Sequence, residues 1–162
     1  MKRLVVLSLC AFFFCGCSAV QTMETVADDI QVMASPATVE ITYFNEDVSA
    51  ITADGGDRLY FCDGYTVAVQ ILNSVNLENS IRMMTGYSSD DLTVMKTSRD
   101  GLPAYEYVWT AAGESQEQMC RGILLDDGMF HYAITVMADY SQAGELQQTW
   151  QELLNSVSIN TD

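Results

Sequence analysis

Residues 103–139 read PAYEYVWTAAGESQEQMCRGILLDDGMFHYAITVMAD, and they decide the fold because they predict three successive β-strands. In the first and third strands, aromatic and β-branched side chains recur at every second position, which is the period of a sheet with a buried face. The Asp127-Gly128 pair between two strand patterns indicates a hairpin. The strands of this antiparallel meander are predicted at Pro103–Ala111, Gln116–Leu125 and Met129–Ala138.

Segments on both sides of the meander add strands and two helices. Asn76 is predicted to cap a short helix that ends at Gly86. Asp139 is predicted to cap a last helix, in which apolar side chains from Leu146 to Val157 share one face. The class is therefore α+β, with a central antiparallel sheet and helices packed on its faces. Further strands are predicted at 38–44, 48–52, 58–62, 65–72, 92–97 and 156–160.

Composition indicates one folded domain with an acidic surface. The chain has 162 residues, of which 49% are hydrophobic, so it can bury a core. Its formal net charge is −15, from 7 basic and 22 acidic residues. No run of acidic residues exceeds two, which indicates a dispersed, solvated surface. Such a surface argues against a nucleic-acid partner, because nothing offsets the phosphate charge.

The first residues, MKRLVVLSLCAFFFCGC, carry an export signal. Lys2 and Arg3 precede an apolar segment, Leu4–Phe14, that is too short to be a permanent membrane span. The four residues Phe14-Cys15-Gly16-Cys17 resemble the lipobox of bacterial lipoproteins, although Phe14 stands where leucine is usual. The resemblance implies lipidation of Cys17 and a stable anchor in the membrane. The alternative is an ordinary secretory signal with an incidental cysteine.

These features divide the chain into three parts. Residues 1–16 are predicted to be a lipoprotein signal peptide, 17–36 a lipidated N-terminus with a flexible tether, and 37–162 the folded domain. The predicted location is the extracytoplasmic face of the cell membrane.

Two cysteines, Cys62 and Cys120, lie in the predicted domain. In an exported protein they could form one disulfide, provided that their strands are neighbours with facing side chains. The alternative is two thiols that pack as small apolar residues. Neither belongs to a CxxC motif, so neither a thioredoxin-like nor a zinc site is predicted.

The order of these features resembles the PsbP-like family, which includes an extrinsic photosystem II protein and DcrB-type bacterial envelope lipoproteins. The resemblance is carried by Asp100-Gly101, Tyr105-Glu106-Tyr107, the segment Asp126–Tyr132, and Trp150 with Leu154–Val157. It implies an α/β/α sandwich over most of residues 37–160. It implies no catalytic residues, since the family is not an enzyme family and its members serve as assembly factors or accessory subunits.

Candidate chemistry in the sequence is sparse. The chain's one histidine, His131, lies on the strand side opposite Phe130 and Tyr132, where a polar-face or helix-covered position is expected. Glu106 is expected to point to solvent, on the face opposite its tyrosine neighbours. The pairs Asp90-Asp91 and Asp126-Asp127 lack the spacing of a calcium loop, so they indicate turns. No metal site and no cofactor are predicted.

Aromatic side chains are the one feature that could support binding. Large amphipathic rings are favoured at interfaces and also in sheet cores. The sequence predicts a non-enzymatic, membrane-anchored envelope lipoprotein whose domain binds a protein partner or a small ligand. The alternatives are an envelope hydrolase that uses His131 with a nearby acid, and a metal carrier that uses surface carboxylates. The candidate partner surface consists of Tyr105, Tyr107, Trp109 and His131.

Overall fold

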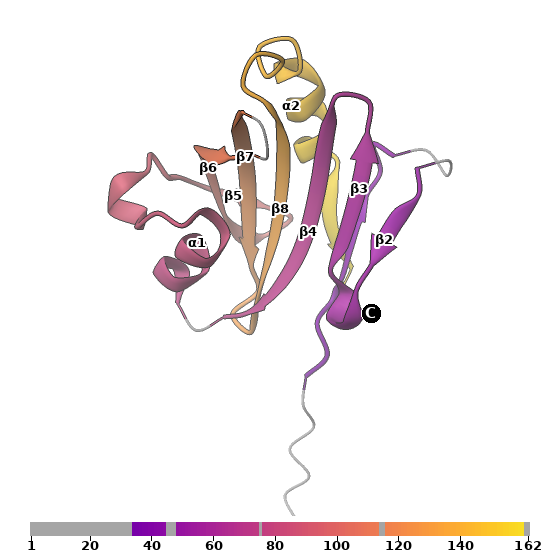
Figure 1. Cartoon of the computed structure of the whole chain (residues 1–162). Helices are drawn as coiled ribbons and strands as arrows, with labels where there is room; N and C mark the ends of the chain where they lie inside the picture. The colour runs from indigo at the N-terminus through magenta and orange to yellow at the C-terminus, as the bar shows by residue number, and fades with distance from the viewer. Residues whose placement is uncertain (1–33, 45–47, 75, 114–115, 161–162) are drawn as a thin grey trace, which may run out of the picture. The chain divides into compact units, whose positions relative to one another are not determined.

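The computed structural model describes residues 34–44, 48–74, 76–113 and 116–160 of the chain (Figure 1). They belong to one structural unit, Ala34–Asp162. The predicted signal peptide, the predicted lipidation site Cys17 and most of the predicted tether lie outside the described residues.

Seven strands form an antiparallel sheet in the order β2-β3-β4-β8-β7-β6-β5 (Figure 1). Strands β1 and β9 pair with each other as a separate two-stranded antiparallel ladder. Within the described residues, two α-helices and two short 3-10 helices complete the fold. The strands are β1 (Thr38–Ile41), β2 (Ala50–Thr52), β3 (Arg58–Cys62), β4 (Tyr65–Asn73), β5 (Met95–Arg99), β6 (Leu102–Ala112), β7 (Glu117–Asp126), β8 (Phe130–Asp139) and β9 (Val157–Asn160). The helices are η1 (Asp54–Gly56), α1 (Leu77–Thr85), η2 (Ser89–Asp91) and α2 (Gln147–Asn155).

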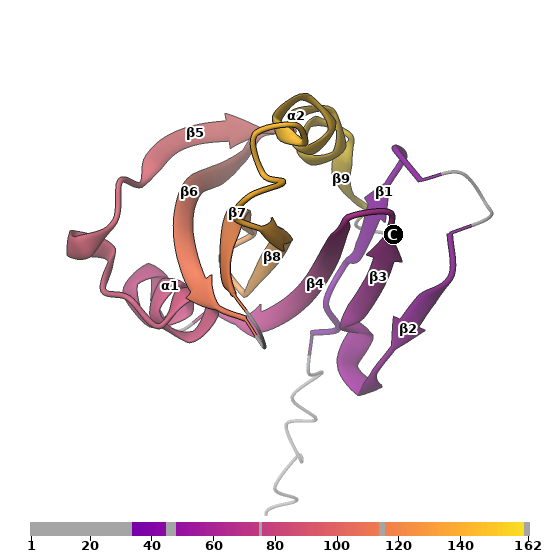
Figure 2. The same cartoon turned by 45° about the horizontal axis from the view of Figure 1, so that its top comes forward.

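The two α-helices cover opposite faces of the sheet. Leu124 and Leu125 are consecutive on β7, so their side chains point to opposite faces. Leu124 belongs to the apolar cluster of Ile81 on α1, whereas Leu125 belongs to that of Trp150 on α2. Figure 2 shows the two helices at separate positions around the curved sheet. The predicted class, α+β with helices packed on an antiparallel sheet, is confirmed.

The predicted meander is present as β6, β7 and β8, each within one residue of its predicted ends. The strand before it was predicted too early, by three residues at its start and two at its end, because Met95–Arg99 rather than Leu92–Thr97 forms β5. The turn residues Asp100 and Gly101 have φ of 50° and 83°. Positive φ at both turn positions is typical of a type I′ hairpin, and this two-residue turn fixes the pairing of Arg99 with Leu102.

The last helix begins later than predicted. Asp139 is the final residue of β8, and its backbone carbonyl accepts hydrogen bonds from the N–H groups of Gln142 and Ala143. A turn therefore stands where the helix start was expected, and α2 begins at Gln147 without a side-chain cap. Val157, predicted on the helix face, instead starts β9 and is buried there.

Helix α1 has the predicted ends. The Asn76 side chain accepts a hydrogen bond from Asn79 N at 2.7 Å, and Gly86, with φ of 80°, donates its N–H to Arg82 O. Glu78 in the first turn ties α1 to η2, since its carboxylate accepts from Ser88 Oγ, from Ser89 N and Oγ, and from Arg82. These hydrogen bonds from the two serines and Arg82 lower the pKa of Glu78 from 4.5 to about 2.

Replacing Glu78 should therefore change how stability depends on pH. A carboxyl whose pKa is lower in the folded state stabilises it above pH 4.5, and this contribution is lost as the pH falls towards 2. We expect Glu78→Gln to lower the melting temperature at pH 7 but much less at pH 2. Glu145→Gln, at an exposed site, is the control. An equal loss at both pH values would contradict the expected role of the carboxylate.

Gly122 makes room for two aromatic rings between β7 and α1. It lies opposite Tyr107 in the β6–β7 ladder. A Cβ at position 122 would lie 3.0 Å from Tyr107 Cε2 and 3.2 Å from Trp109 Cζ3. The two rings are packed against each other, with centroids 5.4 Å apart, so they have little freedom to move away.

We expect Gly122→Val to destabilise the domain by about 1–3 kcal/mol, because overpacking forces buried rings off their preferred positions. Equilibrium urea unfolding followed by tryptophan fluorescence measures the loss. The control is Gly144→Ala, at a position where an added Cβ meets no atom within 4 Å. A Gly122→Val domain as stable as the control would show that the rings do not need the glycine.

Candidate functional site

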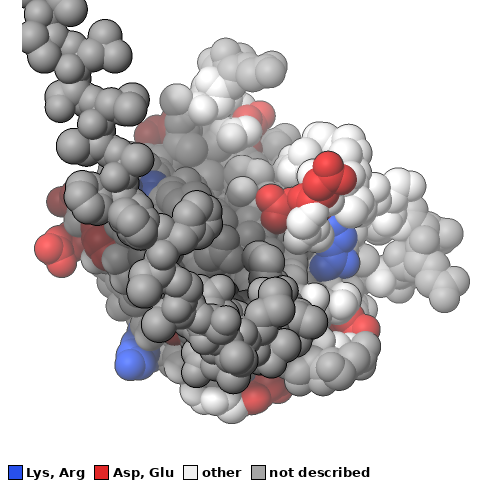
Figure 3. All heavy atoms as spheres, turned by 90° about the horizontal axis from the view of Figure 1, so that it is seen from below, with Lys and Arg blue, Asp and Glu red and all other residues white. Residues whose placement is uncertain are grey.

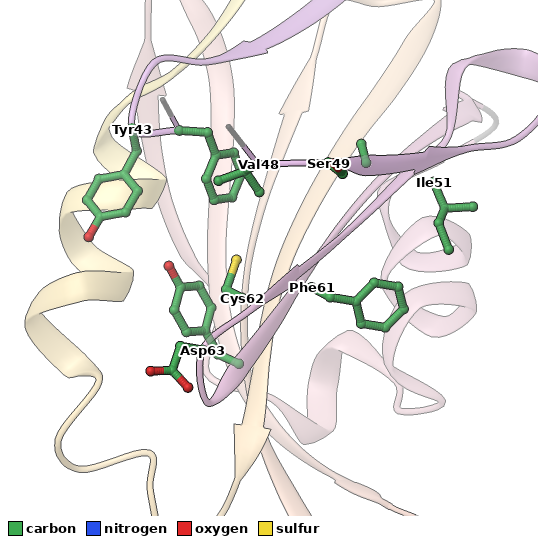
Figure 4. Close-up of a pocket in the computed structure, with 10 residues that line it drawn as sticks. Tyr43, Val48, Ser49, Ile51, Phe61, Cys62 and Asp63 are labelled. Carbon is green, nitrogen blue, oxygen red and sulfur yellow. The ribbon is translucent and has the colours of Figure 1, made fainter. Parts of the chain in front are cut away.

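A hollow of about 720 Å³ lies between the segment that leads into β2 and the end of the β3–β4 hairpin (Figure 4). We call it the β2–β3 hollow. Strand β2 pairs only with Arg58–Tyr60, so the last residues of β3 extend beyond it. That mismatch in length leaves side chains of β3 without a neighbouring strand. The lining residues are Tyr43, Phe44, Val48, Ser49, Ala50, Ile51, Phe61, Cys62, Asp63 and Tyr65.

Four of the residues that line the hollow are aromatic: Tyr43, Phe44, Phe61 and Tyr65. Phe44 stacks on the buried Tyr60, with centroids 4.6 Å apart, and Tyr43 meets the edge of Phe44. At the other end, Phe61 and Ile51 are 60% and 62% exposed. Apolar side chains this exposed, beside a concave surface, are typical of a site for another molecule.

The polar groups of the hollow are a thiol, hydroxyls and one carboxylate. Burial raises the pKa of Cys62, and the hydrogen bond with Tyr65 offsets only part of this effect. Burial and the same hydrogen bond raise the pKa of Tyr65. Both groups are therefore neutral at pH 7, and the charged lining residue is Asp63. Because the described lining residues include no lysine or arginine, the hollow suits neutral or cationic groups better than anions.

The predicted surface position of Tyr107 and Trp109 is wrong, because both side chains are buried in the apolar cluster under α1, whereas Tyr105 is only partly buried. Tyr107 and Trp109 are 2% and 6% exposed and pack with Ile81, while Tyr105 is half-buried against the same cluster. They face inward because α1 covers this side of β6. The alternation of aromatic and polar side chains along β6 predicted the apolar side of the strand correctly, but it could not show that a helix covers that side.

His131, the fourth residue of that predicted surface, is also buried, with 1% exposure. Its Nδ1 lies 2.6 Å from Ser80 Oγ on α1, and its Nε2 lies 3.0 Å from Ser74 Oγ and 3.6 Å from an oxygen of Asp126. The expected position under a helix is confirmed. These contacts attach α1 to the central strand of the sheet.

Glu106 lies on the expected face of β6, opposite the tyrosines, but it is not solvated as expected. Its side chain is 16% exposed and pairs with Arg121 at 3.2 Å. Arg121 also donates to Gln151 on α2. The pair therefore links β6, β7 and α2.

The two domain cysteines are free thiols, so the disulfide alternative is not realised. Cys62 lies on β3 and Cys120 on β7, and β4 and β8 run between those strands. Sequence reasoning could not decide this, because strand order comes from the tertiary fold. Burial raises the pKa of Cys120 to about 11.

We expect the two thiols to differ in reactivity. Iodoacetamide at pH 8 should slowly modify Cys62, which borders the hollow. It should modify Cys120, which has no exposed surface, only after the domain unfolds. Peptide mass spectrometry of the full chain reports both sites, and labelling in urea is the control. Equal labelling in the folded protein, or a mass change at both sites on reduction, would contradict the structure.

Among the described residues, no group of three or more His, Cys, Asp or Glu side chains could hold a metal ion. None of the helices there has the length and apolar character needed to cross a membrane. On the face seen in Figure 3, acidic side chains lie at several separate places, as expected of a dispersed acidic surface.

Of the residues that line the β2–β3 hollow, the sequence singled out Cys62 only as a possible disulfide partner, and it did not single out Tyr43, Phe44, Phe61 or Asp63. Phe61 follows Tyr60 and precedes Cys62, so β3 has apolar side chains on both faces although it lies near the sheet edge. An apolar outer face on a strand near an edge is a signal that could have identified the site. Recognising it needs the strand order.

Comparison with known proteins identifies the fold class. No protein-family model matches the chain, and no curated protein matches it. Solved structures do match. PA94 from Pseudomonas aeruginosa, a protein of unknown function named as a candidate regulator, aligns with a TM-score of 0.52 and 9% identity over 81% of this chain and 89% of that one.

Cyanobacterial PsbP (CyanoP) from Synechocystis sp. PCC 6803 aligns with a TM-score of 0.51 and 8% identity, over 80% of this chain and 96% of that one. At such low identity the likeness concerns the fold alone. The chain therefore has a PsbP-like α+β fold. Its predicted relation to DcrB-type lipoproteins remains a prediction.

Proposed function

We propose that this protein is a membrane-anchored, non-enzymatic lipoprotein of the cell envelope that binds a protein partner or a small ligand in the β2–β3 hollow. The observation that carries the proposal is the hollow itself, where exposed apolar side chains of Ile51 and Phe61 border an aromatic-lined depression. Burial of such rings by a second molecule is favourable by about 25 cal/mol per Å² of apolar surface.

The proposed anchor rests on the sequence. A basic start, an apolar segment and the lipobox-like Phe14-Cys15-Gly16-Cys17 precede the folded domain. Lipid chains on Cys17 would hold the domain at the extracytoplasmic face of the cell membrane.

The geometry around His131 weighs against the alternative of a hydrolase that uses this residue. Ser80 and Asp126 flank the imidazole as a nucleophile and an acid would, yet Ser80 is only 3% exposed. Neither His131 nor Ser80 lines the β2–β3 hollow. A base must be able to reach its substrate, so this cluster fits the attachment of α1 better than acyl transfer.

Crosslinking in the native membrane tests the anchor and the partner together. We expect the wild-type protein to be membrane-bound and to carry lipid on Cys17, which mass spectrometry of its N-terminal peptide detects. The Cys17→Ser variant should be released from the membrane. A stoichiometric crosslinked partner with the wild-type protein supports the proposal. An unmodified Cys17 would contradict the lipoprotein assignment, whatever the crosslinks show.

The role of the hollow is tested by Phe61→Asp. This change places a charge among the exposed apolar side chains, and we expect it to reduce crosslinking at least tenfold without lowering the melting temperature, because Phe61 is 60% exposed. The matched control is Met83→Asp, another exposed apolar residue, on α1. Equal crosslinking in the two variants would show that the hollow is not the binding site.

If no partner is captured, a thermal-shift screen of small neutral and cationic aromatic compounds tests the ligand alternative, with Phe61→Asp as the non-binding control.

A further inference from the structure

Half of strand β6 has no neighbour on its outer side. The edge strand β5 has five residues and pairs only with Leu102–Glu106, whereas β6 continues to Ala112. From residue 107 onward, β6 is paired on one side only, with β7. We call residues Val108–Ala112 the open edge.

The backbone groups of Val108 and Thr110 point away from β7. Gly113 N donates to Gln116 O at 3.0 Å, which fixes the odd-numbered residues of β6 as those bonded to β7. The Thr110 carbonyl accepts a hydrogen bond from Tyr87 Oη, which confirms that it faces outward. Among the described residues, none bonds to the N–H or C=O of Val108 or to the N–H of Thr110.

The open edge lacks the protection that exposed edges usually carry. Its sequence, Val-Trp-Thr-Ala-Ala, contains no charge and no proline. The neighbouring edge strand β5 does contain Lys96 and Arg99. Charged side chains on an edge prevent other chains from adding to it, so their absence leaves a template for a further strand.

Two hollows follow the open edge. One of about 450 Å³ is bordered by Met95, Val108 and Arg121, and one of about 410 Å³ by Tyr87, Thr110 and Glu117. A strand that adds to an edge gains main-chain hydrogen bonds along its length and places alternate side chains in such hollows.

Acidic side chains beside the open edge favour a strand that carries basic residues. Asp91 borders the first hollow and Glu117 the second, whereas Arg121 is already paired with Glu106 at 3.2 Å. Lysine or arginine side chains would therefore be attracted here. A second copy of this chain would bring another net charge of −15, so self-pairing is disfavoured.

We propose that the open edge Val108–Ala112 binds an extended segment of a partner protein, rich in lysine or arginine, as an additional β-strand. This site is distinct from the β2–β3 hollow, which lies towards the opposite end of the sheet. Tyr87, 41% exposed, moves off the Thr110 carbonyl when the strand binds.

The test uses the full chain in detergent and two synthetic nine-residue peptides of alternating sequence, one of lysine and valine and one of glutamate and valine. We expect the lysine peptide to bind at least tenfold more tightly by fluorescence anisotropy. Amide hydrogen exchange should slow at Val108 and Thr110 when it binds. Equal binding of the two peptides, no binding of either, or unchanged exchange at both amides would overturn the proposal.

Substitutions at Val108 separate edge pairing from general adhesion to an acidic protein. Val108→Pro removes an N–H that does not bond to β7, so the sheet should tolerate it while the affinity for the lysine peptide falls at least tenfold. Val108→Thr keeps the N–H and should stay within about twofold of the wild type. Equal affinity of the two variants would overturn strand addition.

A second pair of variants keeps the test decisive if the proline variant does not fold. Val108→Lys should weaken binding of the lysine peptide about tenfold, whereas Val108→Glu should not weaken it. Binding that is the same in both variants would overturn the charge argument. Protection of Val108 that grows with protein concentration alone, together with a dimer in light scattering, would assign the edge to a second copy and overturn the partner assignment.

Discussion

Burial of strand β8 on both faces is the constraint on which the rest of this structure depends. Residues 131–136 are all buried: Tyr132, Ile134 and Val136 belong to the cluster under α2, whereas His131, on the other face, contacts Ser80 of α1. A strand of this kind must lie in the middle of a sheet and have a helix on each face. The order β4-β8-β7, with α1 and α2 on opposite faces, satisfies that requirement.

Two buried polar side chains of β8, His131 and Tyr132, have hydrogen-bond partners, whereas the buried Thr135 Oγ1 has none among the described residues. His131 is held by Ser74 and Ser80, and the hydroxyl of Tyr132 donates to Asp127 at 2.6 Å while accepting from Ala37 N. Although burial opposes it, hydrogen bonding from Tyr132 and from the N–H groups after the turn lowers the pKa of Asp127. The chain's one histidine thus joins α1 to the sheet. This structural role accounts for the position of a residue that the sequence offered as a candidate base for a hydrolase.

The strand residues that lack a neighbouring strand lie near the two ends of the sheet. At one end β2 is shorter than β3, which exposes Phe61 beside the hollow, and at the other β5 is shorter than β6, which leaves the backbone of Val108 free. Short edge strands limit unwanted pairing over most of a sheet edge, but they also create the places where another molecule can bind. Both proposed sites arise from this mismatch in strand length.

The sequence was enough to predict the meander, the ends of α1 and the α+β class, because strand alternation, Asp-Gly turns and helix caps are local and each depends on a few neighbouring residues. It did not determine where α2 starts, since Asp139 extends β8 by pairing with Gln118. Only the tertiary structure decided that Tyr107 and Trp109 are covered by α1, that Cys62 and Cys120 lie on strands separated by two others, and that Phe61 is exposed. These depend on strand order and on which helix covers which face, which are set by contacts between residues far apart in the chain.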